Sequence, residues 1–258
     1  MSDVVKAVVL GFVQGATEFL PVSSSGHLIA LKQIFRFDAD LAFDVCLHIA
    51  TLVAVFIYFG RELVRLARSA DAWPIAVRVI VGTIPAGLIG WAIEKQREHT
   101  PSWFVVVGWA ISATYLFLTA NRGGSGTYAR LTLFRAFLIG GSQGIAAALP
   151  GFSRSGISIS SGLWLGLERK QAFAFSFLLA IPVILGAGLV DGLKLFRGEA
   201  SPVPGGWPAL AAAMVAAFAV GLVAIHVVYR AVVGNRFHRF GLYNLTAGVL
   251  FAIYLATR

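Results

Sequence analysis

The sequence predicts an all-α integral membrane protein in which about six transmembrane helices and two re-entrant helical hairpins form an inverted-topology repeat. Three observations carry this prediction. Hydrophobic residues make up 58% and charged residues 13% of the 258 positions, whereas soluble proteins average about 25% charged residues. The apolar surplus extends along the whole chain, and a soluble core cannot absorb it. A polar motif also occurs twice, so we expect one membrane domain, 1–258, made of two similar halves.

Six apolar runs are long enough to cross a bilayer, for which about 17 to 25 residues are needed. They cover residues 42–60, 76–93, 103–120, 172–190, 209–229 and 240–257. Two further apolar regions, 4–35 and 135–167, are interrupted by polar motifs and by Pro21 and Pro150. Because proline breaks a helix, each of these regions is predicted to form two short helices that meet at a turn, as in a re-entrant hairpin.

Arginine is concentrated in three connections between the spans, which predicts an orientation. These connections are 61–78, 121–135 and 229–239, and the positive-inside rule places them in the cytoplasm. The connections 94–101 and 194–206 carry little excess charge and are expected outside. The hairpin over 4–35 then enters from the outer side, and the hairpin over 135–167 from the cytoplasmic side. Topology explains the net charge of +9, so no nucleic-acid partner is expected.

An internal repeat relates the two hairpins. The segment "GFVQGATEFLP" (11–21) matches "GGSQGIAAALP" (140–150), which places Gln143 over Gln14 with a shift of 129 residues (143 − 14). After one inserted residue, "SSSGH" lies over "SRSGI". An odd number of spans separates the hairpins, so the halves, about 1–121 and 135–258, are expected to be inserted in opposite orientations. In such proteins sites lie near the midplane, where broken helices face the ligand.

The turns of the two hairpins predict an anion site. Irregular backbone at membrane depth is tolerated only where it is buried in protein or lines a water-filled cavity. Hydroxyls, glycines and helix N-termini favour a negatively charged ligand, and Arg154 adds a planar cation that matches phosphate oxygens. We therefore expect a phosphate group to bind. The residues expected to bind it are Gln14, Ser23, Ser25, Gly26, Ser153, Ser155, Gly156 and Ser158.

Four residues are candidates for the chemistry: Glu18, Ser24, His27 and Arg154. An ionisable side chain inside a membrane segment is a functional candidate by default. Glu18 is expected to act as a general base or to hold a divalent cation that bridges phosphates. His27 can hydrogen-bond and activate Ser24, or attack phosphorus itself. The sequence leaves both choices of nucleophile open.

The motifs "QGATEFLPVSSSGH" and "PGFSRSGISIS" closely resemble the two signatures of the bacterial undecaprenyl-diphosphate phosphatases, also called bacitracin-resistance proteins. The likeness extends over almost the whole chain. It implies a hydrolase that converts undecaprenyl diphosphate to the monophosphate and inorganic phosphate. Such an enzyme recycles the lipid carrier of peptidoglycan synthesis at the outer face of the bacterial inner membrane.

The resemblance also implies roles for individual residues. It assigns the acidic pair and the serine to Gln14, Glu18 and Ser24, the histidine to His27, and the phosphate-binding stretch to residues 153–155. Many members have glutamate where this chain has Gln14, so Glu18 alone must supply the base or the metal ligand. The family usually has threonine where this chain has a serine at 158. A requirement for Mg²⁺ or Ca²⁺ stays open, and no organic cofactor is expected.

A lipid transporter or flippase is the alternative function, because inverted repeats with paired hairpins are a common transporter plan. Release of phosphate from a polyprenyl diphosphate would favour the enzyme. The expected partners are that lipid and the surrounding membrane lipids, and the sequence leaves a homodimer and the preferred tail length open. Two histidines that lie singly on apolar spans, His48 and His226, are interpreted as packing residues. The one cysteine, Cys46, excludes an intrachain disulfide.

Overall fold

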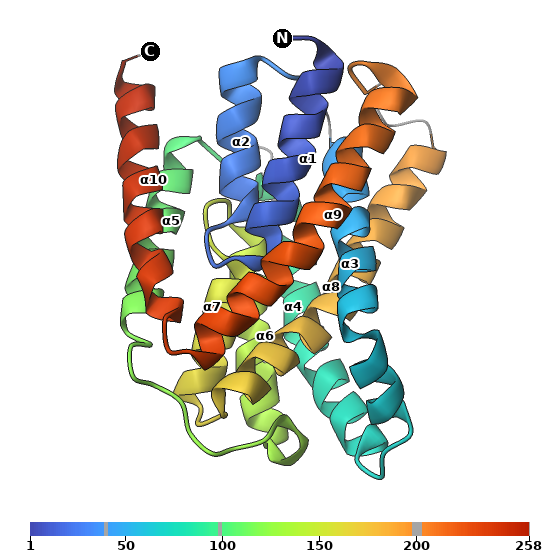
Figure 1. Cartoon of the computed structure of the whole chain (residues 1–258), viewed down its shortest axis with the longest axis vertical. Coiled ribbons are helices and arrows are strands. Elements are labelled where there is room, and N and C mark those ends of the chain that lie inside the picture. The colour runs from blue at the N-terminus through green and yellow to red at the C-terminus, as the bar shows by residue number, and fades with distance from the viewer. Residues whose placement is uncertain (39–40, 98–99, 198–202, 258) are drawn as a thin grey trace.

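The computed structural model describes residues 1–38, 41–97, 100–197 and 203–257, and all its regular structure over these ranges is helical. Parts of the connections 94–101 and 194–206, predicted to lie outside, fall beyond the described residues. In chain order the helices, shown in Figure 1, are α1 (Asp3–Phe19), α2 (Ser24–Phe35), α3 (Leu41–Ala67), α4 (Ala72–Arg97), α5 (Trp103–Phe117), the 3₁₀ turn η1 (Tyr128–Arg130), α6 (Leu133–Ala148), α7 (Arg154–Trp164), α8 (Arg169–Phe196), α9 (Gly206–Val233), the 3₁₀ turn η2 (Phe237–Arg239) and α10 (Phe240–Ala256).

Every apolar region of the sequence forms helix, and the regions around Pro21 and Pro150 break into helix pairs as predicted. Among the described residues, five helices and not six are long and apolar enough to cross a membrane: α3, α4, α8, α9 and the helix formed by η2 and α10. The predicted span over 103–120 is wrong in its length. Its helix, α5, has 15 residues and covers about 22 Å at about 1.5 Å per residue, less than a hydrocarbon core of about 30 Å. The helix stops short because the chain turns after Phe117 and Asn121 takes a positive φ of 62°.

The two hairpins enter the helix bundle from opposite ends and meet at its centre (Figure 1). α1 begins beside the chain N-terminus and α2 returns toward the same end, while α6 and α7 occupy the other half of the molecule. The hydroxyl of Ser155, near the tip of the second hairpin, donates a hydrogen bond of 3.2 Å to the carbonyl of Leu20 at the tip of the first. Residues 135 positions apart in the chain are therefore neighbours at the centre.

Each hairpin packs through small residues against a long helix of the other half. α1 crosses α9 so closely that a Cβ atom on Gly11 would collide with the carbonyl of Ala213, and α6 crosses α4 so closely that one on Gly140 would collide with the carbonyl of Gly82. Only glycine permits such an approach of two helix backbones. Gly11 and Gly140 are also 129 residues apart (140 − 11), the shift between the two motifs. The sequence repeat is thus matched by equivalent helix contacts.

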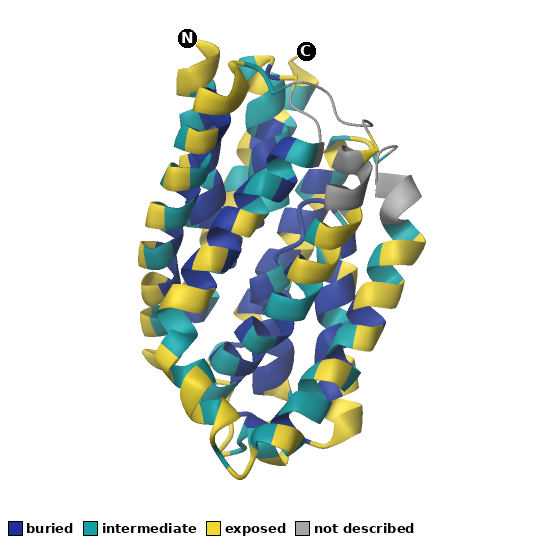
Figure 2. Cartoon of the chain, turned by 90° about the vertical axis from the view of Figure 1, so that its right-hand side faces the viewer, coloured by how far each residue is buried: buried dark blue, intermediate teal, exposed yellow. Residues whose placement is uncertain are grey.

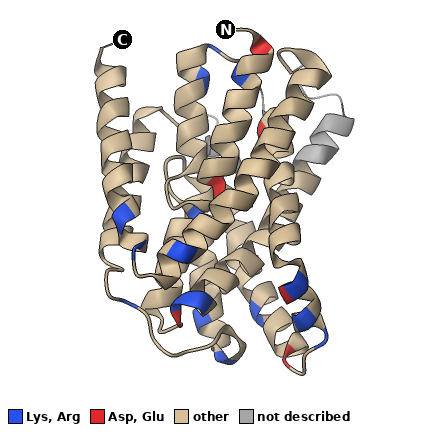
Figure 3. Ribbon diagram, viewed as in Figure 1, with Lys and Arg blue, Asp and Glu red and all other residues tan. Residues whose placement is uncertain are grey.

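The three arginine-rich connections lie together at one end of the molecule, where Figure 3 shows most of the Lys and Arg positions. Arg78 donates to the carbonyl of Leu131 at 2.5 Å, and Arg169, at the start of α8, donates to the side chain of Asn235 at 2.5 Å. The first bond joins connection 61–78 to connection 121–135, and the second joins α8 to connection 229–239. The charge asymmetry predicted between the two ends of the bundle is therefore present in the fold.

The distribution of burial is that of a membrane protein. Figure 2 shows exposed residues along the outer faces of the helices and buried residues between them, and large apolar side chains such as Leu189 and Val215 are among the exposed ones. Polar side chains that a soluble protein would place outside are instead buried at the centre, among them Gln14, Glu18 and Ser153. Polar groups buried in an apolar bundle need partners, and the hairpin tips supply them.

Candidate active site

The first hairpin tip is held by hydrogen bonds from distant helices. Ser23 is the N-cap of α2, and its hydroxyl accepts from the amide of the third helical residue at 3.2 Å. Its backbone takes a positive φ of 66°, which is uncommon for a residue with a Cβ. The indole of Trp109 on α5 donates to the carbonyl of Val22 at 2.8 Å, and the amide of Asn244 on α10 donates to the carbonyl of Pro21 at 2.8 Å. The strained turn is therefore fixed by buried donors.

The second hairpin tip repeats this arrangement. Ser153 is the N-cap of α7, and its hydroxyl accepts from the amide of the third helical residue at 3.0 Å. Its own amide donates to the hydroxyl of Ser112 on α5 at 2.9 Å. In both hairpins a second serine hydroxyl lies 3.4 Å from that of the cap, Ser25 in the first and Ser155 in the second. Two helix N-termini thus converge, and each carries partial positive charge and unpaired N–H groups.

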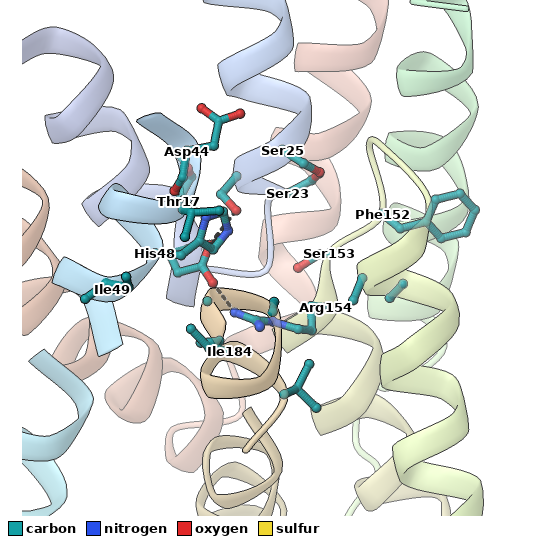
Figure 4. A pocket seen from close by; sticks show the side chains of 18 residues that line it. Thr17, Ser23, Ser25, Asp44, His48, Ile49, Phe152, Ser153, Arg154 and Ile184 are labelled. Carbon is teal, nitrogen blue, oxygen red and sulfur yellow. Dashed lines mark hydrogen bonds and ion pairs between the residues drawn. The ribbon is translucent and has the colours of Figure 1, made fainter. Parts of the chain in front are cut away.

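A cavity of about 150 Å³ lies between the two tips, α3 and α8 (Figure 4). A single water molecule needs about 10 to 15 Å³ of such space, so the cavity has room for a phosphate group. One side of it is apolar and is formed by α3, α6 and α8. The polar residues that line it are Thr17, Glu18, Ser23, Ser24, Ser25, Asp44, His48, Ser153 and Arg154.

Glu18 lies at the centre of the polar contacts. Its Oε1 forms an ion pair with the guanidinium of Arg154, marked by the dashed line in Figure 4. Its Oε2 accepts hydrogen bonds from the hydroxyl of Ser24 at 2.6 Å and from the side-chain amide of Gln14 at 2.9 Å. The Glu18 side chain is 2% exposed, and a buried charge needs such partners. The structure therefore brings Glu18, Ser24 and Arg154 together from the two hairpins.

The structure places His27 outside the cavity lining. Its Nδ1 lies 2.7 Å from the carbonyl oxygen of Ser23, and its Nε2 lies 2.8 Å from the hydroxyl of Tyr243 on α10. Its ring packs edge-on against Trp109, with the ring centroids 5.2 Å apart. Ser24 donates its hydroxyl to Glu18 instead, so the expected Ser24–His27 pair is not formed. Both histidine nitrogens are used to hold the tip of the first hairpin.

His48, interpreted from the sequence as a packing residue, lines the cavity instead. Its Nε2 lies 3.5 Å from Oε2 of Glu18, and its Nδ1 lies 2.7 Å from the carbonyl oxygen of Asp44. Asp44 also lines the cavity and forms an ion pair of 2.7 Å with Lys32 of α2. The signal for these residues was present in the sequence, because ionisable groups within a span are functional candidates by default.

Five of the residues expected to bind phosphate, Gln14 among them, are absent from the lining of this cavity. Gly26 packs against the indole of Trp109, and Gly156 packs against Pro21. The hydroxyl of Ser155 donates to the carbonyl of Leu20 at the tip of the first hairpin. The hydroxyl of Ser158 donates to the carbonyl of Arg154 at 2.8 Å and lies 2.5 Å from the hydroxyl of Ser176 on α8. These residues join the hairpins to each other and to their neighbours. The structure does not place them among the residues that line the cavity.

The side chains around Glu18 do not fit a divalent cation. Mg²⁺ and Ca²⁺ bind sets of oxygen ligands. The Glu18 carboxylate instead accepts from three donors, a guanidinium, a side-chain amide and a hydroxyl, and the imidazole Nε2 of His48 lies 3.5 Å from it. In the described part of the chain, no three His, Cys, Asp or Glu side chains gather as a metal-binding group. A cation at Glu18 would have to displace these donors and lie beside Arg154.

Comparison with known proteins agrees with the motifs. A family profile described as "Bacitracin resistance protein BacA" matches residues 7–250. A protein of Desulfosudis oleivorans named "Undecaprenyl-diphosphatase" is 39% identical, with 95% of this chain and 96% of its own length covered. A protein of the same name from Methanosphaera stadtmanae is 32% identical, with 97% of each chain covered. One from Saccharophagus degradans is 41% identical over 76% of this chain and 78% of its own. With its two motifs in one cavity and a match over nearly its whole length, this chain belongs to the bacitracin resistance protein BacA family.

Proposed function

We propose that the chain is a membrane hydrolase that converts undecaprenyl diphosphate to undecaprenyl phosphate and inorganic phosphate. The undecaprenyl phosphate is the carrier lipid of peptidoglycan synthesis. The activity is the one named for relatives that align over almost the whole chain. The single observation that carries the proposal is the cavity in which Glu18 and Arg154 meet across two helix N-termini. Such N-termini favour phosphate, and a guanidinium matches its oxygens.

The contacts support Ser24 as the nucleophile. Its hydroxyl lines the cavity and already donates to Glu18 at 2.6 Å, within the reach that a general base needs. Attack on the terminal phosphorus forms an Oγ–P bond, and the bond from that phosphorus to the bridging oxygen breaks. The guanidinium of Arg154 and the free N–H groups of α2 and α7 lie where they can stabilise the charge on the transferring group. Water then hydrolyses the phosphoserine.

We propose that the lipid tail leaves the cavity between α3 and α8. Ile49 of α3 and Ala187 of α8 line the cavity and are also exposed on the outer surface of the bundle. Val183, Ile184 and Gly188 of α8 continue the same apolar wall. An apolar opening toward lipid accommodates a polyprenyl chain, because neither the tail nor the wall then faces water.

We propose that the cavity opens toward the outer face of a bacterial inner membrane and that residues 1–121 and 135–258 form an inverted repeat. Asp44 lies at the start of α3, and α3 ends at the arginine-rich connection 61–78. The cavity therefore extends away from the end that the positive-inside rule assigns to the cytoplasm. The matched crossings at Gly11 and Gly140 and the matched caps of α2 and α7 support the repeat.

The test is phosphate release from undecaprenyl diphosphate by the purified protein in detergent. We expect turnover by the wild type and by Arg68→Ala, a control at an exposed arginine just after α3, and loss of turnover in Arg154→Ala. The rival function, lipid translocation, has the same fold plan in its favour. Movement of the labelled headgroup across vesicles without phosphate release would support the carrier and refute the hydrolase.

A further inference from the structure

We propose that His48 of α3 is a catalytic residue of this cavity and carries the proton that the reaction moves, a role that the motif-based reading gives to His27. The inference rests on the proposed function and adds to it a residue that lies outside both motifs. Three geometric features lead to it: the position of the His48 ring in the cavity lining, the tautomer of His48, and the contacts that already engage the other candidate groups, His27 among them.

The first feature is the position of the His48 ring. His48 and Arg154 line the cavity (Figure 4). Glu18 and Ser24 line it too, whereas His27 is not among the lining residues. The His48 side chain is 29% exposed, so the ring has an open face rather than a close-packed surround. A histidine that serves only packing would be enclosed by apolar side chains; this one faces a carboxylate.

The second feature is the tautomer that the backbone imposes. A carbonyl oxygen only accepts hydrogen bonds, so Nδ1 of His48, 2.7 Å from the carbonyl of Asp44, carries a hydrogen. Nε2 is then the atom available for proton transfer, and it lies 3.5 Å from Oε2 of Glu18. The same oxygen accepts the hydroxyl of Ser24 at 2.6 Å. The serine oxygen, one carboxylate oxygen and an imidazole nitrogen therefore follow one another at distances of 2.6 and 3.5 Å.

The third feature is that the other candidate groups described in or beside the cavity are engaged or do not titrate. Both nitrogens of His27 are bonded, one to a backbone carbonyl and one to Tyr243. Gln14, beside Glu18, carries an amide, which does not titrate. Asp44 is the other lining carboxylate, and it is ion-paired with Lys32 at 2.7 Å.

Ser24 Oγ attacks the terminal phosphorus, and its proton passes through Glu18 to Nε2 of His48. As the bridging P–O bond breaks, Nε2 gives this proton to the departing lipid monophosphate. In the second half, a water molecule attacks the phosphoserine and the bond from phosphorus to Oγ breaks. One water proton returns to Ser24 by the same path, which leaves inorganic phosphate and the starting enzyme.

The experiment compares His48→Ala, His48→Gln and His27→Ala with the wild type, using undecaprenyl diphosphate in detergent micelles. His226→Ala is the matched control, because His226 is an exposed histidine on a long apolar helix, α9. We expect kcat of both His48 variants to fall about 10²- to 10⁴-fold, the range of a lost general acid–base group, with little change in KM. Added imidazole should raise the kcat of His48→Ala at least tenfold. It should leave the kcat of His27→Ala unchanged, because the His27 side chain positions a turn.

A wild-type kcat in both His48→Ala and His48→Gln would overturn the proposal. It would also be overturned if imidazole raised the kcat of His27→Ala but not that of His48→Ala. Thermal unfolding of each variant separates a lost proton carrier from a lost fold, and His48→Gln keeps a side chain of similar length if the alanine variant does not fold. A wild-type protein that releases no phosphate would instead refute the proposed function. The two failures are therefore distinguishable.

Discussion

Replacement of Arg154 by alanine leaves the carboxylate of Glu18 without its ion-pair partner inside the protein. The two side chains are 16% and 2% exposed, and removal of one partner of a buried pair costs about 3 to 5 kcal/mol. The hydrogen bonds that Ser24 and Gln14 donate to Glu18, at 2.6 and 2.9 Å, remain. We therefore expect the lower end, about 3 kcal/mol. At about 2 to 4 °C per kcal/mol for a chain of this size, the Tm should fall by about 6 to 12 °C.

The assay is thermal unfolding of the purified protein in detergent, measured together with phosphate release. Arg154→Ala should lose both stability and activity. The double variant Glu18→Gln with Arg154→Ala contains no buried charge at this position, so it should regain most of the lost Tm while remaining inactive. Arg68→Ala, at an exposed arginine, should stay within about 0.5 kcal/mol of the wild type.

Two results would refute this reasoning. The first is an Arg154→Ala protein that unfolds within about 2 °C of the wild type, a change of 1 kcal/mol or less on the same scale. The second is a double variant that is no more stable than the single one, because the lost stability would then not come from an unpaired Glu18.

Three further predictions concern the tail opening, the cation and the first hairpin tip. Gly188 lines the cavity, so Gly188→Leu should lower kcat/KM for the full-length lipid about tenfold or more but leave kcat/KM for a short prenyl diphosphate unchanged. Gly186 has open space around it, so Gly186→Leu should change kcat/KM for neither substrate. Equal effects of the two variants would exclude this tail path. Removal of divalent cations by a chelator should leave wild-type phosphate release unchanged, and loss of turnover in chelator would contradict this. Gln14→Glu places a second carboxylate beside Glu18, so added Ca²⁺ should raise the Tm of this variant. Trp109→Phe should cost about 1 to 3 kcal/mol in thermal unfolding, since it leaves a buried tip carbonyl without its donor; an unchanged Tm would show that this bond does not hold the tip.

Much of the fold could be predicted from the sequence because it depends on local signals. Apolar runs define the long helices, and Pro21 and Pro150 mark the breaks in the two hairpins. The repeat and the arginine-rich connections, taken together, also predict that the hairpins enter from opposite ends. The contact of Glu18 with Arg154 follows from that arrangement, although 136 residues separate them.

The rest of the site depends on side-chain directions that no local pattern encodes. His27 follows the serine motif, yet its ring turns away from the cavity because its two nitrogens lie within hydrogen-bond distance of the Ser23 carbonyl and of Tyr243, 216 residues further along the chain. His48 stands alone on an apolar span, and only the packing of α3 against α1 brings it to Glu18. The length of α5 was also missed, because apolar composition continues past the turn that ends the helix.

The most direct test of the central claim is a structure of the protein with a non-hydrolysable, methylene-bridged analogue of the lipid diphosphate. We expect the terminal phosphonate group between the N-termini of α2 and α7, in contact with the guanidinium of Arg154 and within reach of the hydroxyl of Ser24. The tail should pass between α3 and α8. A headgroup bound elsewhere, with the Glu18–Arg154 cavity empty, would contradict it.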